Sequence, residues 1–109
     1  MGSDQVSEMI RDIVRKIVTS YEPEKIILFG SYAYGEPDED SDIDLLIIKD
    51  TDKRPIDRWI EVKRLVRDRH RRAPVSPLVL TNKELQDRLS IRDFFLQEIL
   101  EKGQVLYEG

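Results

Sequence analysis

Two short apolar runs, separated by a turn and an acidic loop, constrain the fold of this chain more than any other feature. The first run covers residues 25–29 and is followed by a glycine-serine pair, and the second covers residues 43–48 and opens on an aspartate-isoleucine-aspartate motif. Apolar runs of this length bounded by turn residues are typical of buried strands. The sequence therefore predicts two strands, with a small turn at the end of one and two carboxylates at the start of the other.

Helical patterns flank these strands. Apolar residues from Val6 to Tyr21 recur at helical spacing, which predicts a first helix that ends before Pro23. A long helix is predicted to begin near Pro55, because proline is tolerated in the first turn. Trp59 lies on the apolar face of this helix and is expected in the core.

The last third of the chain predicts one more strand, two helices and a short edge strand. Residues 75–80 read as the strand, and the proline at position 77 favours an edge position or a bulge. Residues 81–84 form a capping box that begins a helix. A last helix is expected to open at Ser90 or Ile91 and to end just before Gly103, and residues 105–107 can add the edge strand. Its expected apolar set is Phe94, Phe95, Ile99 and Leu100.

Length and composition limit the class of protein. A chain of 109 residues with one modest core predicts a single domain, 1–109, of the α/β (α+β) class with a small sheet. There is no cysteine, so disulfides and thiolate metal sites are excluded. The sequence has no apolar run of membrane-spanning length and no signal-peptide pattern, so a cytoplasmic protein without a membrane partner is expected.

Charge is unevenly distributed along the chain. Residues 53–72 contain nine Lys or Arg and three Asp or Glu, whereas the whole chain carries a net charge of −4. Charge along a helix usually marks a solvated face, and this is the favoured interpretation. The alternative is a contact with a partner or a nucleic acid through the arginines at 67, 69, 71 and 72, although no interleaved aromatic residues offer a platform for bases.

Asp42 and Asp44 are the strongest candidates for chemistry. Two residues apart on a strand, their side chains are expected on the same face. Like charges at such close range repel each other unless a cation lies between them. Carboxylate oxygens are hard ligands that suit Mg²⁺ bound together with nucleotide phosphates. The alternative is that both are solvated residues of the acidic run 38–40, but the nearby glycine-serine turn favours the metal-binding interpretation.

Gly30 and Ser31 are the candidates for binding the phosphates. Gly30 allows backbone amides to approach a phosphate closely. Ser31 adds a hydroxyl and is expected to cap a short helical turn over residues 32–34, whose N-terminal amides favour an anion. An ordinary strand-to-helix turn with a serine cap is the alternative. Together with the two aspartates, the pair predicts a site for a nucleotide polyphosphate.

With these residues the chain resembles the nucleotidyltransferase superfamily of the polymerase β type. It is most similar to the minimal nucleotidyltransferases, small single domains often encoded beside a HEPN-domain protein in prokaryotic toxin-antitoxin modules. The resemblance implies a small mixed sheet flanked by helices, Mg²⁺, and transfer of a nucleotidyl group from ATP or another nucleoside triphosphate to a hydroxyl. The matching residues are Gly30, Ser31, Ala33, Gly35 and Ser41 to Leu45.

The resemblance also implies roles and partners. Asp42 and Asp44 would be the catalytic and metal-binding residues, and Gly30 and Ser31 would bind the nucleotide. The expected partners are the triphosphate and a HEPN-type protein that would be silenced by attachment of AMP. A homo-oligomer is left open, and nucleic acid ranks behind these partners.

One position departs from the family pattern. The resemblance implies a third carboxylate on the strand after the long helix, and that position holds Ser76. In a two-metal scheme this acid helps to hold the metal that activates the attacking hydroxyl. Two hypotheses follow: an active Mg²⁺-dependent nucleotidyltransferase, or a weakened module of the same fold that acts by gripping a HEPN-type partner.

Overall fold

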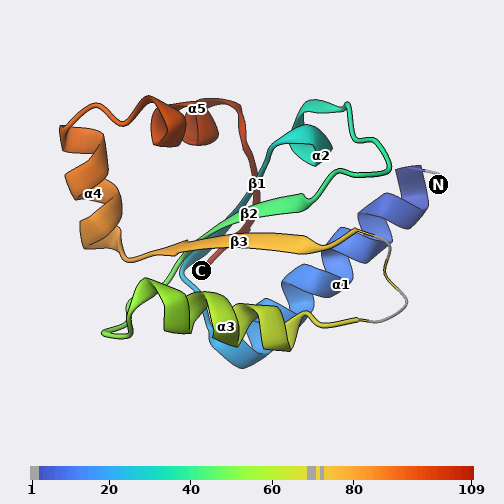
Figure 1. Ribbon diagram of the computed structural model, residues 1–109, viewed down its shortest axis with the longest axis horizontal. Coiled ribbons are helices and arrows are strands. Elements are labelled where there is room, and N and C mark those ends of the chain that lie inside the picture. The colour runs from blue at the N-terminus through green and yellow to red at the C-terminus, as the bar shows by residue number, and fades with distance from the viewer. Residues whose placement is uncertain (1–2, 69–70, 72) are drawn as a thin grey trace.

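The computed structural model describes residues 3–68, 71 and 73–109 and consists of one four-stranded sheet with helices on both faces (Figure 1). The strand order is β3-β2-β1-β4; β1 pairs antiparallel with β2 and β4, and β2 pairs parallel with β3. This mixed sheet confirms the predicted α/β (α+β) class. The elements in chain order are α1 (Ser3–Tyr21), β1 (Lys25–Phe29), α2 (Ser31–Tyr34), β2 (Ile43–Ile48), α3 (Pro55–Leu65), β3 (Val75–Leu80), α4 (Asn82–Ser90), α5 (Phe94–Lys102) and β4 (Gln104–Glu108).

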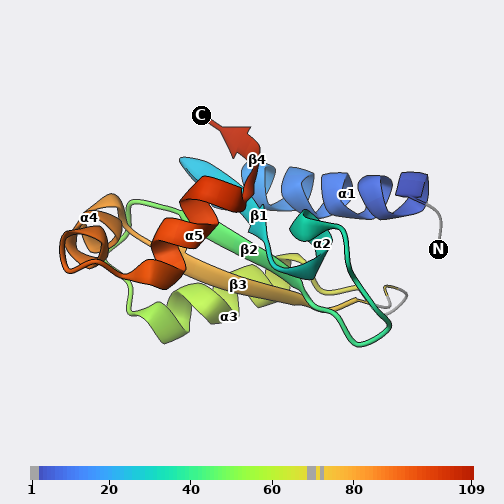
Figure 2. The same ribbon diagram turned by 90° about the horizontal axis from the view of Figure 1, so that it is seen from above.

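Strand alternation divides the core into two clusters, one on each face of the sheet. Successive side chains of a strand point to opposite faces, so each apolar strand supplies both clusters. Helices α1 and α3 cover one face and α4 and α5 cover the other (Figures 1 and 2). The α1/α3 face buries Ile26, Leu28, Ile43, Leu45 and Ile47 from β1 and β2. The α4/α5 face holds Ile27, Phe29, Leu46 and Ile48 from the same strands.

The position of β3 agrees with its sequence. It lies at the edge of the sheet and pairs only with β2, as Pro77 predicts. Proline has no N–H to donate to a second neighbouring strand, so an edge strand tolerates it. The predicted edge strand near the C-terminus is also confirmed, because β4 forms the opposite edge.

The end of the chain differs from the prediction. Helix α4 runs to Ser90, and α5 begins only at Phe94, where the Asp93 carboxylate accepts a hydrogen bond of 3.1 Å from the Leu96 N–H. The packing of α5 on the sheet also buries a different face from the one predicted. Leu96 and Ile99 are therefore buried, whereas three of the four expected apolar residues are exposed: Phe94, Phe95 and Leu100.

The buried face of α3 is also rotated relative to the prediction. Trp59 is 44% exposed, so its assignment to the core is wrong, whereas Val62 of the same helix and Val66 just after it are buried. Arg58 is buried instead. Its guanidinium donates to the Lys53 carbonyl at 2.7 Å and to Glu84 Oε1 at 2.6 Å, and these acceptors offset the cost of burying a charge.

Candidate functional site

Gly30 ends β1 in a conformation that other residues rarely adopt. Its φ of +74° combined with a ψ of −158° is accessible almost only to glycine. A Cβ at this position would collide with Asp44 Oδ2 and would lie 3.1 Å from Asp44 Cγ. Glycine is therefore required here for both backbone conformation and space, and the bare backbone of the turn packs directly on a carboxylate of β2.

Asp44 lies in the middle of this arrangement. In the antiparallel pair it stands opposite Phe29, the last residue of β1, and in the parallel pair it stands beside Ser76 of β3. It shares the α4/α5 face of the sheet with Leu46 and is half-buried. The sheet thus brings the end of β1, the start of β2 and the start of β3 together around one carboxylate.

Asp42 precedes β2 and is exposed, while Ile43 between the two aspartates is completely buried on the opposite face. Burial raises the pKa of Asp44, and the negative charge of Asp42 raises it further. The two carboxylates are therefore close enough to repel each other. Such a pair gains from a nearby cation, because the cation removes the repulsion.

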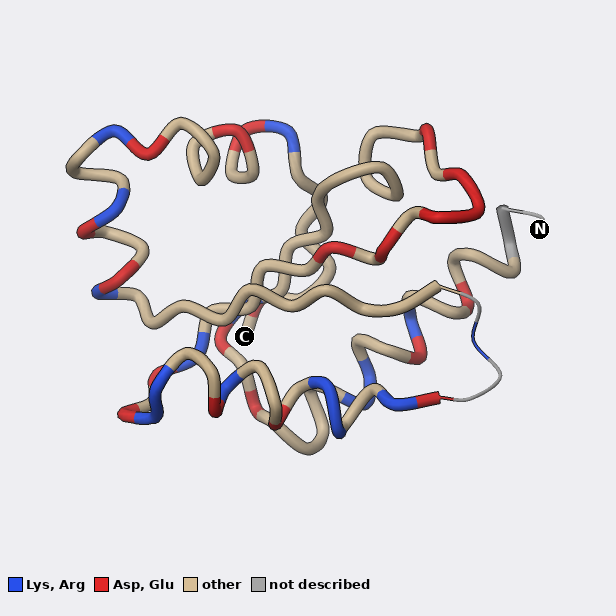
Figure 3. Tube along the Cα trace, in the orientation of Figure 1, with Lys and Arg blue, Asp and Glu red and all other residues tan. Residues whose placement is uncertain are grey.

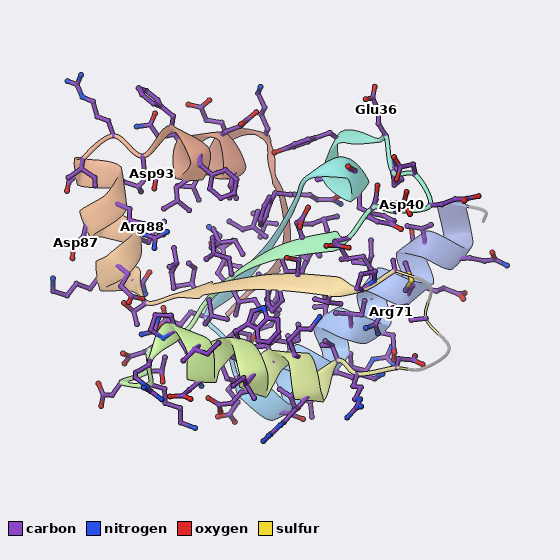
Figure 4. All side chains as sticks on the ribbon, in the orientation of Figure 1. Glu36, Asp40, Arg71, Asp87, Arg88 and Asp93 are labelled. Atoms are coloured by element: carbon purple, nitrogen blue, oxygen red, sulfur yellow. The ribbon has the colours of Figure 1, made fainter. Side chains whose placement is uncertain are left out.

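The acidic loop before β2 has a defined structure. Ser41 Oγ accepts a hydrogen bond of 2.9 Å from the Asp38 N–H and donates one of 3.2 Å to Asp38 Oδ1. Asp38 Oδ1 also accepts from the Asp40 N–H at 2.9 Å. These bonds fix the turn directly before Asp42. Glu36 and Asp40 on the same loop are exposed, and acidic residues recur along the loop up to β2 (Figures 3 and 4).

Ser31 follows Gly30 but does not cap the helix as predicted. Helix α2 starts at Ser31 itself, Gly30 occupies the cap position, and no side chain caps the helix. The Gly30 carbonyl instead accepts hydrogen bonds of 3.0 Å from the N–H groups of Ala33 and Tyr34. The Ser31 side chain is therefore not used as a cap, and the residue lies at the junction of β1 and α2, next to Gly30.

Ser76 occupies the position at which the resemblance implies a third carboxylate. In the parallel pair of β2 and β3 it stands in register with Asp44. Within residues 3–68, 71 and 73–109, no group of three or more His, Asp or Glu side chains could hold a metal ion.

The structure adds a residue that the sequence did not single out for function. Phe95 of α5 is 53% exposed, and its ring meets that of Phe29 edge-on, with 5.7 Å between centroids. The sequence placed Phe95 in the core because the start of α5 was set too early. The Asp93 cap, with Leu96 and Ile99 spaced three residues apart, is the signal that would have shown its true position.

The basic stretch starts on α3, away from this site, and leads into the start of β3, where the Pro74 carbonyl accepts a hydrogen bond of 2.8 Å from the Ile43 N–H. Lys and Arg residues gather along α3 and the segment after it, on the other side of the sheet from α4 and α5 (Figure 3). Several are engaged in local contacts: Lys63 Nζ donates to the Val75 carbonyl at 2.8 Å, and Arg71 Nε donates to the Ala73 carbonyl at 2.8 Å. Arg69 and Arg72 lie outside the described residues. The interpretation of a solvated face and the alternative of a partner or nucleic-acid contact both stay predictions.

A search of the described helices for membrane spans found none with the necessary length and apolar character.

Comparisons with known proteins agree with this geometry. The family model described as "Polymerase beta, Nucleotidyltransferase" matches residues 11–109. A protein of Methanocaldococcus jannaschii that is provisionally named a protein adenylyltransferase is 35% identical over 100 residues, which cover 90% of this chain and 94% of that protein. A second protein of that organism with the same provisional name is 41% identical over 46 residues, 40% of this chain and 46% of its own length.

A solved structure supports the fold. The crystal structure of a provisionally named nucleotidyltransferase from Sulfolobus solfataricus superposes with a TM-score of 0.62 at 24% identity, covering 93% of this chain and 78% of that one. At this identity the likeness concerns the fold alone. The family match, however, spans nearly the whole chain and includes both the glycine-serine turn and the two aspartates. This chain therefore belongs to the polymerase β nucleotidyltransferase family.

Proposed function

We propose that this protein transfers a nucleotidyl group, AMP, from a nucleoside triphosphate to a hydroxyl acceptor in a Mg²⁺-dependent reaction. The observation that carries the proposal is the packing of the Gly30 backbone directly on Asp44, with Asp42 close enough to raise the pKa of Asp44. A bare turn beside two carboxylates is suited to a polyphosphate and the cation that neutralises it.

The residues present fit Mg²⁺. This ion is commonly held by one or two carboxylates together with substrate phosphates and water, so a pair of aspartates is a sufficient protein contribution. Asp42 and Asp44 would hold it. The repulsion between them supports this assignment, since it costs stability unless a cation is bound.

The turn would position the triphosphate. The absence of a side chain at Gly30 lets its backbone pack on Asp44, so a triphosphate bound at this turn would lie close to that carboxylate. The Ser31 hydroxyl offers a hydrogen bond to the phosphate oxygens. In the transfer, the acceptor oxygen forms a bond to the α-phosphorus while the bond from that phosphorus to the bridging oxygen of the β-phosphate breaks. Pyrophosphate leaves with the electron pair of the broken bond, and the proton of the acceptor hydroxyl passes to solvent water. Bound Mg²⁺ would supply charge neutralisation on the phosphates.

Ser76 bears on how that proton is removed. A serine hydroxyl is neutral at ordinary pH and is a weak base, so it supplies neither a second metal ligand of comparable strength nor a general base. This favours slow transfer. The second candidate function is accordingly a nucleotide-binding module of the same fold, which acts by binding a HEPN-type partner and transfers nucleotide weakly.

The proposed substrates follow from the relatives and the resemblance. The provisional name of the Methanocaldococcus proteins, protein adenylyltransferase, supports ATP as donor and a protein hydroxyl as acceptor. We propose a HEPN-type protein as that acceptor, a single catalytic domain over residues 1–109, and a cytoplasmic setting.

The test is calorimetric titration of ATP with and without Mg²⁺, followed by transfer of labelled AMP to a candidate protein acceptor. Wild type is expected to bind ATP only with Mg²⁺, and Asp42→Asn combined with Asp44→Asn is expected to lose that binding. Glu36→Gln with Asp40→Asn removes the same charge from exposed side chains of the neighbouring loop and serves as the control. Equal binding by the wild type and the Asp42/Asp44 variant would show that these residues are wrongly assigned, and ATP binding without transfer would favour the binding module.

A further inference from the structure

An aromatic pair borders the carboxylate site on the same face of the sheet. Phe29 ends β1 and stands opposite Asp44 across the β1–β2 pair, so the two side chains share the α4/α5 face. The Phe95 ring meets the Phe29 ring at an interplanar angle of 85°, with centroids 5.7 Å apart. Phe95 is thus linked to Asp44 through a single intervening side chain.

The Phe95 ring remains largely open to solvent although it is held in place. It is 53% exposed, whereas Leu96 and Ile99 of the same helix are fully or almost fully buried and account for the attachment of α5 to the sheet. An edge-to-face partner fixes the orientation of a ring while leaving its other face free. Phe95 therefore presents an oriented aromatic surface near the carboxylate site. Because Leu96 and Ile99 attach α5 to the sheet, the exposed part of Phe95 is not needed for packing.

Distance and chemistry identify what fits this surface. Asp44 is one cross-strand neighbour away from Phe29, and the Phe29 and Phe95 rings are in contact. Phe95 therefore lies on the order of 10 Å from Asp44, which is comparable to the length of a nucleoside monophosphate. If the phosphates lie at Gly30 and Asp44, the base at the other end of the donor reaches the aromatic pair. Every nucleobase has a flat face that stacks on aromatic side chains.

We propose that Phe95 is a binding residue for the base of the nucleotide donor, held in orientation by Phe29. This inference rests on the function proposed above and extends it from the phosphates to the base. Stacking alone does not distinguish the bases, because every base has an aromatic face. Phe95 therefore increases the affinity for nucleotides relative to inorganic polyphosphate and gives little preference among the bases.

The experiment compares ATP with inorganic tripolyphosphate, which has the phosphates and lacks the base. Both are titrated in Mg²⁺ by calorimetry against wild type, Phe95→Leu, Phe95→Tyr and Phe94→Ala. Leucine keeps the apolar contact with Phe29 but removes the ring, and tyrosine keeps the ring. Phe94 is the matched control, because it is the neighbouring phenylalanine and is 76% exposed.

Phe95→Leu is expected to weaken ATP binding roughly tenfold, the size typical of one stacked base, and to leave tripolyphosphate binding unchanged. Phe95→Tyr should regain most of the ATP affinity that Phe95→Leu loses, because it keeps the ring, and Phe94→Ala should bind ATP like wild type. Unchanged ATP affinity in Phe95→Leu, or equal weakening for both ligands, would overturn the role of Phe95 while leaving the proposed function intact. If wild type binds neither ligand in Mg²⁺, the proposed function fails and this inference fails with it.

Discussion

Only glycine at position 30 allows the turn after β1 to pack against the Asp44 carboxylate. Its positive φ requires a residue without Cβ, and the nearest atoms to any Cβ belong to Asp44. Gly35, four residues after Ser31, also has a positive φ, of +88°, but no atom lies within 4 Å of a Cβ built there. A side chain at Gly35 would therefore cost only backbone strain. A side chain at Gly30 would cost backbone strain and a clash with Asp44.

We expect Gly30→Ala to lower the free energy of unfolding by about 2–4 kcal/mol, because conformational strain and a displaced Asp44 add together. Gly35→Ala should cost only about 1 kcal/mol, the conformational part alone. Urea unfolding measures both values. Gly30→Ala should also lose Mg²⁺-dependent ATP binding, which Gly35→Ala keeps. Equal losses of stability in the two variants would contradict the packing of Gly30 on Asp44.

At the scale of the element, the two ends of β3 have different roles: one end borders the carboxylate site, and the other leads into α4. The start of β3 places Ser76 beside Asp44, and its end leads into the Thr81 capping box of α4. In that box Glu84 Oε1 accepts from the Thr81 N–H at 2.8 Å and from Arg58 of α3 at 2.6 Å. One carboxylate therefore joins two helices from opposite faces of the sheet.

Ser76→Asp is expected to speed AMP transfer by tenfold or more, because a carboxylate beside Asp44 could hold a second metal ion against the attacking hydroxyl; general-base contributions are about 10²–10⁴-fold. The same change should lower the stability of the metal-free protein, since a third carboxylate adds repulsion. Labelled-AMP transfer and thermal melting measure the two effects. Ser76→Asn is the uncharged control. Robust wild-type transfer that Ser76→Asp leaves unchanged would mean that no third acid is needed.

Glu84 predicts a specific pH dependence of stability. The hydrogen bond from Arg58 lowers the pKa of Glu84, with a smaller contribution from the Thr81 cap. The folded state therefore binds this proton less readily than the unfolded state, whose carboxyl titrates near about 4.3. The resulting stabilisation is fully present above that pH and is lost as the pH falls through the lowered pKa of the folded state.

Glu84→Gln keeps the acceptor for the Thr81 N–H but leaves the buried Arg58 without a counter-charge. We expect it to cost about 1–2 kcal/mol at pH 7, a buried-pair penalty reduced because Glu84 is partly exposed, and the difference from wild type should shrink as the pH falls to 3. Urea unfolding at several pH values tests this. Lys83→Gln, which breaks the exposed pair with Asp87, should change little at any pH. A constant difference across pH would contradict the charge-based explanation.

For the whole molecule, ligand binding and folding are linked. The site is assembled from β1, β2 and β3, so it exists only when the sheet is formed, and a ligand that binds it stabilises the folded state. At one hundred times its Kd, Mg²⁺ with ATP should add about 2.7 kcal/mol and raise Tm by roughly 10 °C. Removing Mg²⁺ with EDTA should abolish the shift. A Tm increase that persists in EDTA, or in Asp42→Asn combined with Asp44→Asn, would contradict metal binding at this site.

The sequence determined the features that depend on local patterns. Apolar run length defined β1, β2 and β3, Pro77 predicted an edge strand, and Thr81 and Glu84 predicted the start of α4, because strand, turn and cap preferences act over only a few residues. The site motif could also be read directly, since Gly30, Asp42 and Asp44 lie at the ends of strands that recognisable apolar runs define.

Only the tertiary structure decided which side chains meet across the sheet and which faces of the helices are buried. Ser76 lies beside Asp44 because β2 and β3 pair in parallel with that register, and Arg58 is buried because Glu84, 26 positions along the chain, accepts its hydrogen bond. Trp59 and Phe95 are exposed because the packing of α3 and α5 on the sheet sets their rotation. Local periodicity fixes a helix face only to within about one position, and it is the contacts between distant segments that select the buried face.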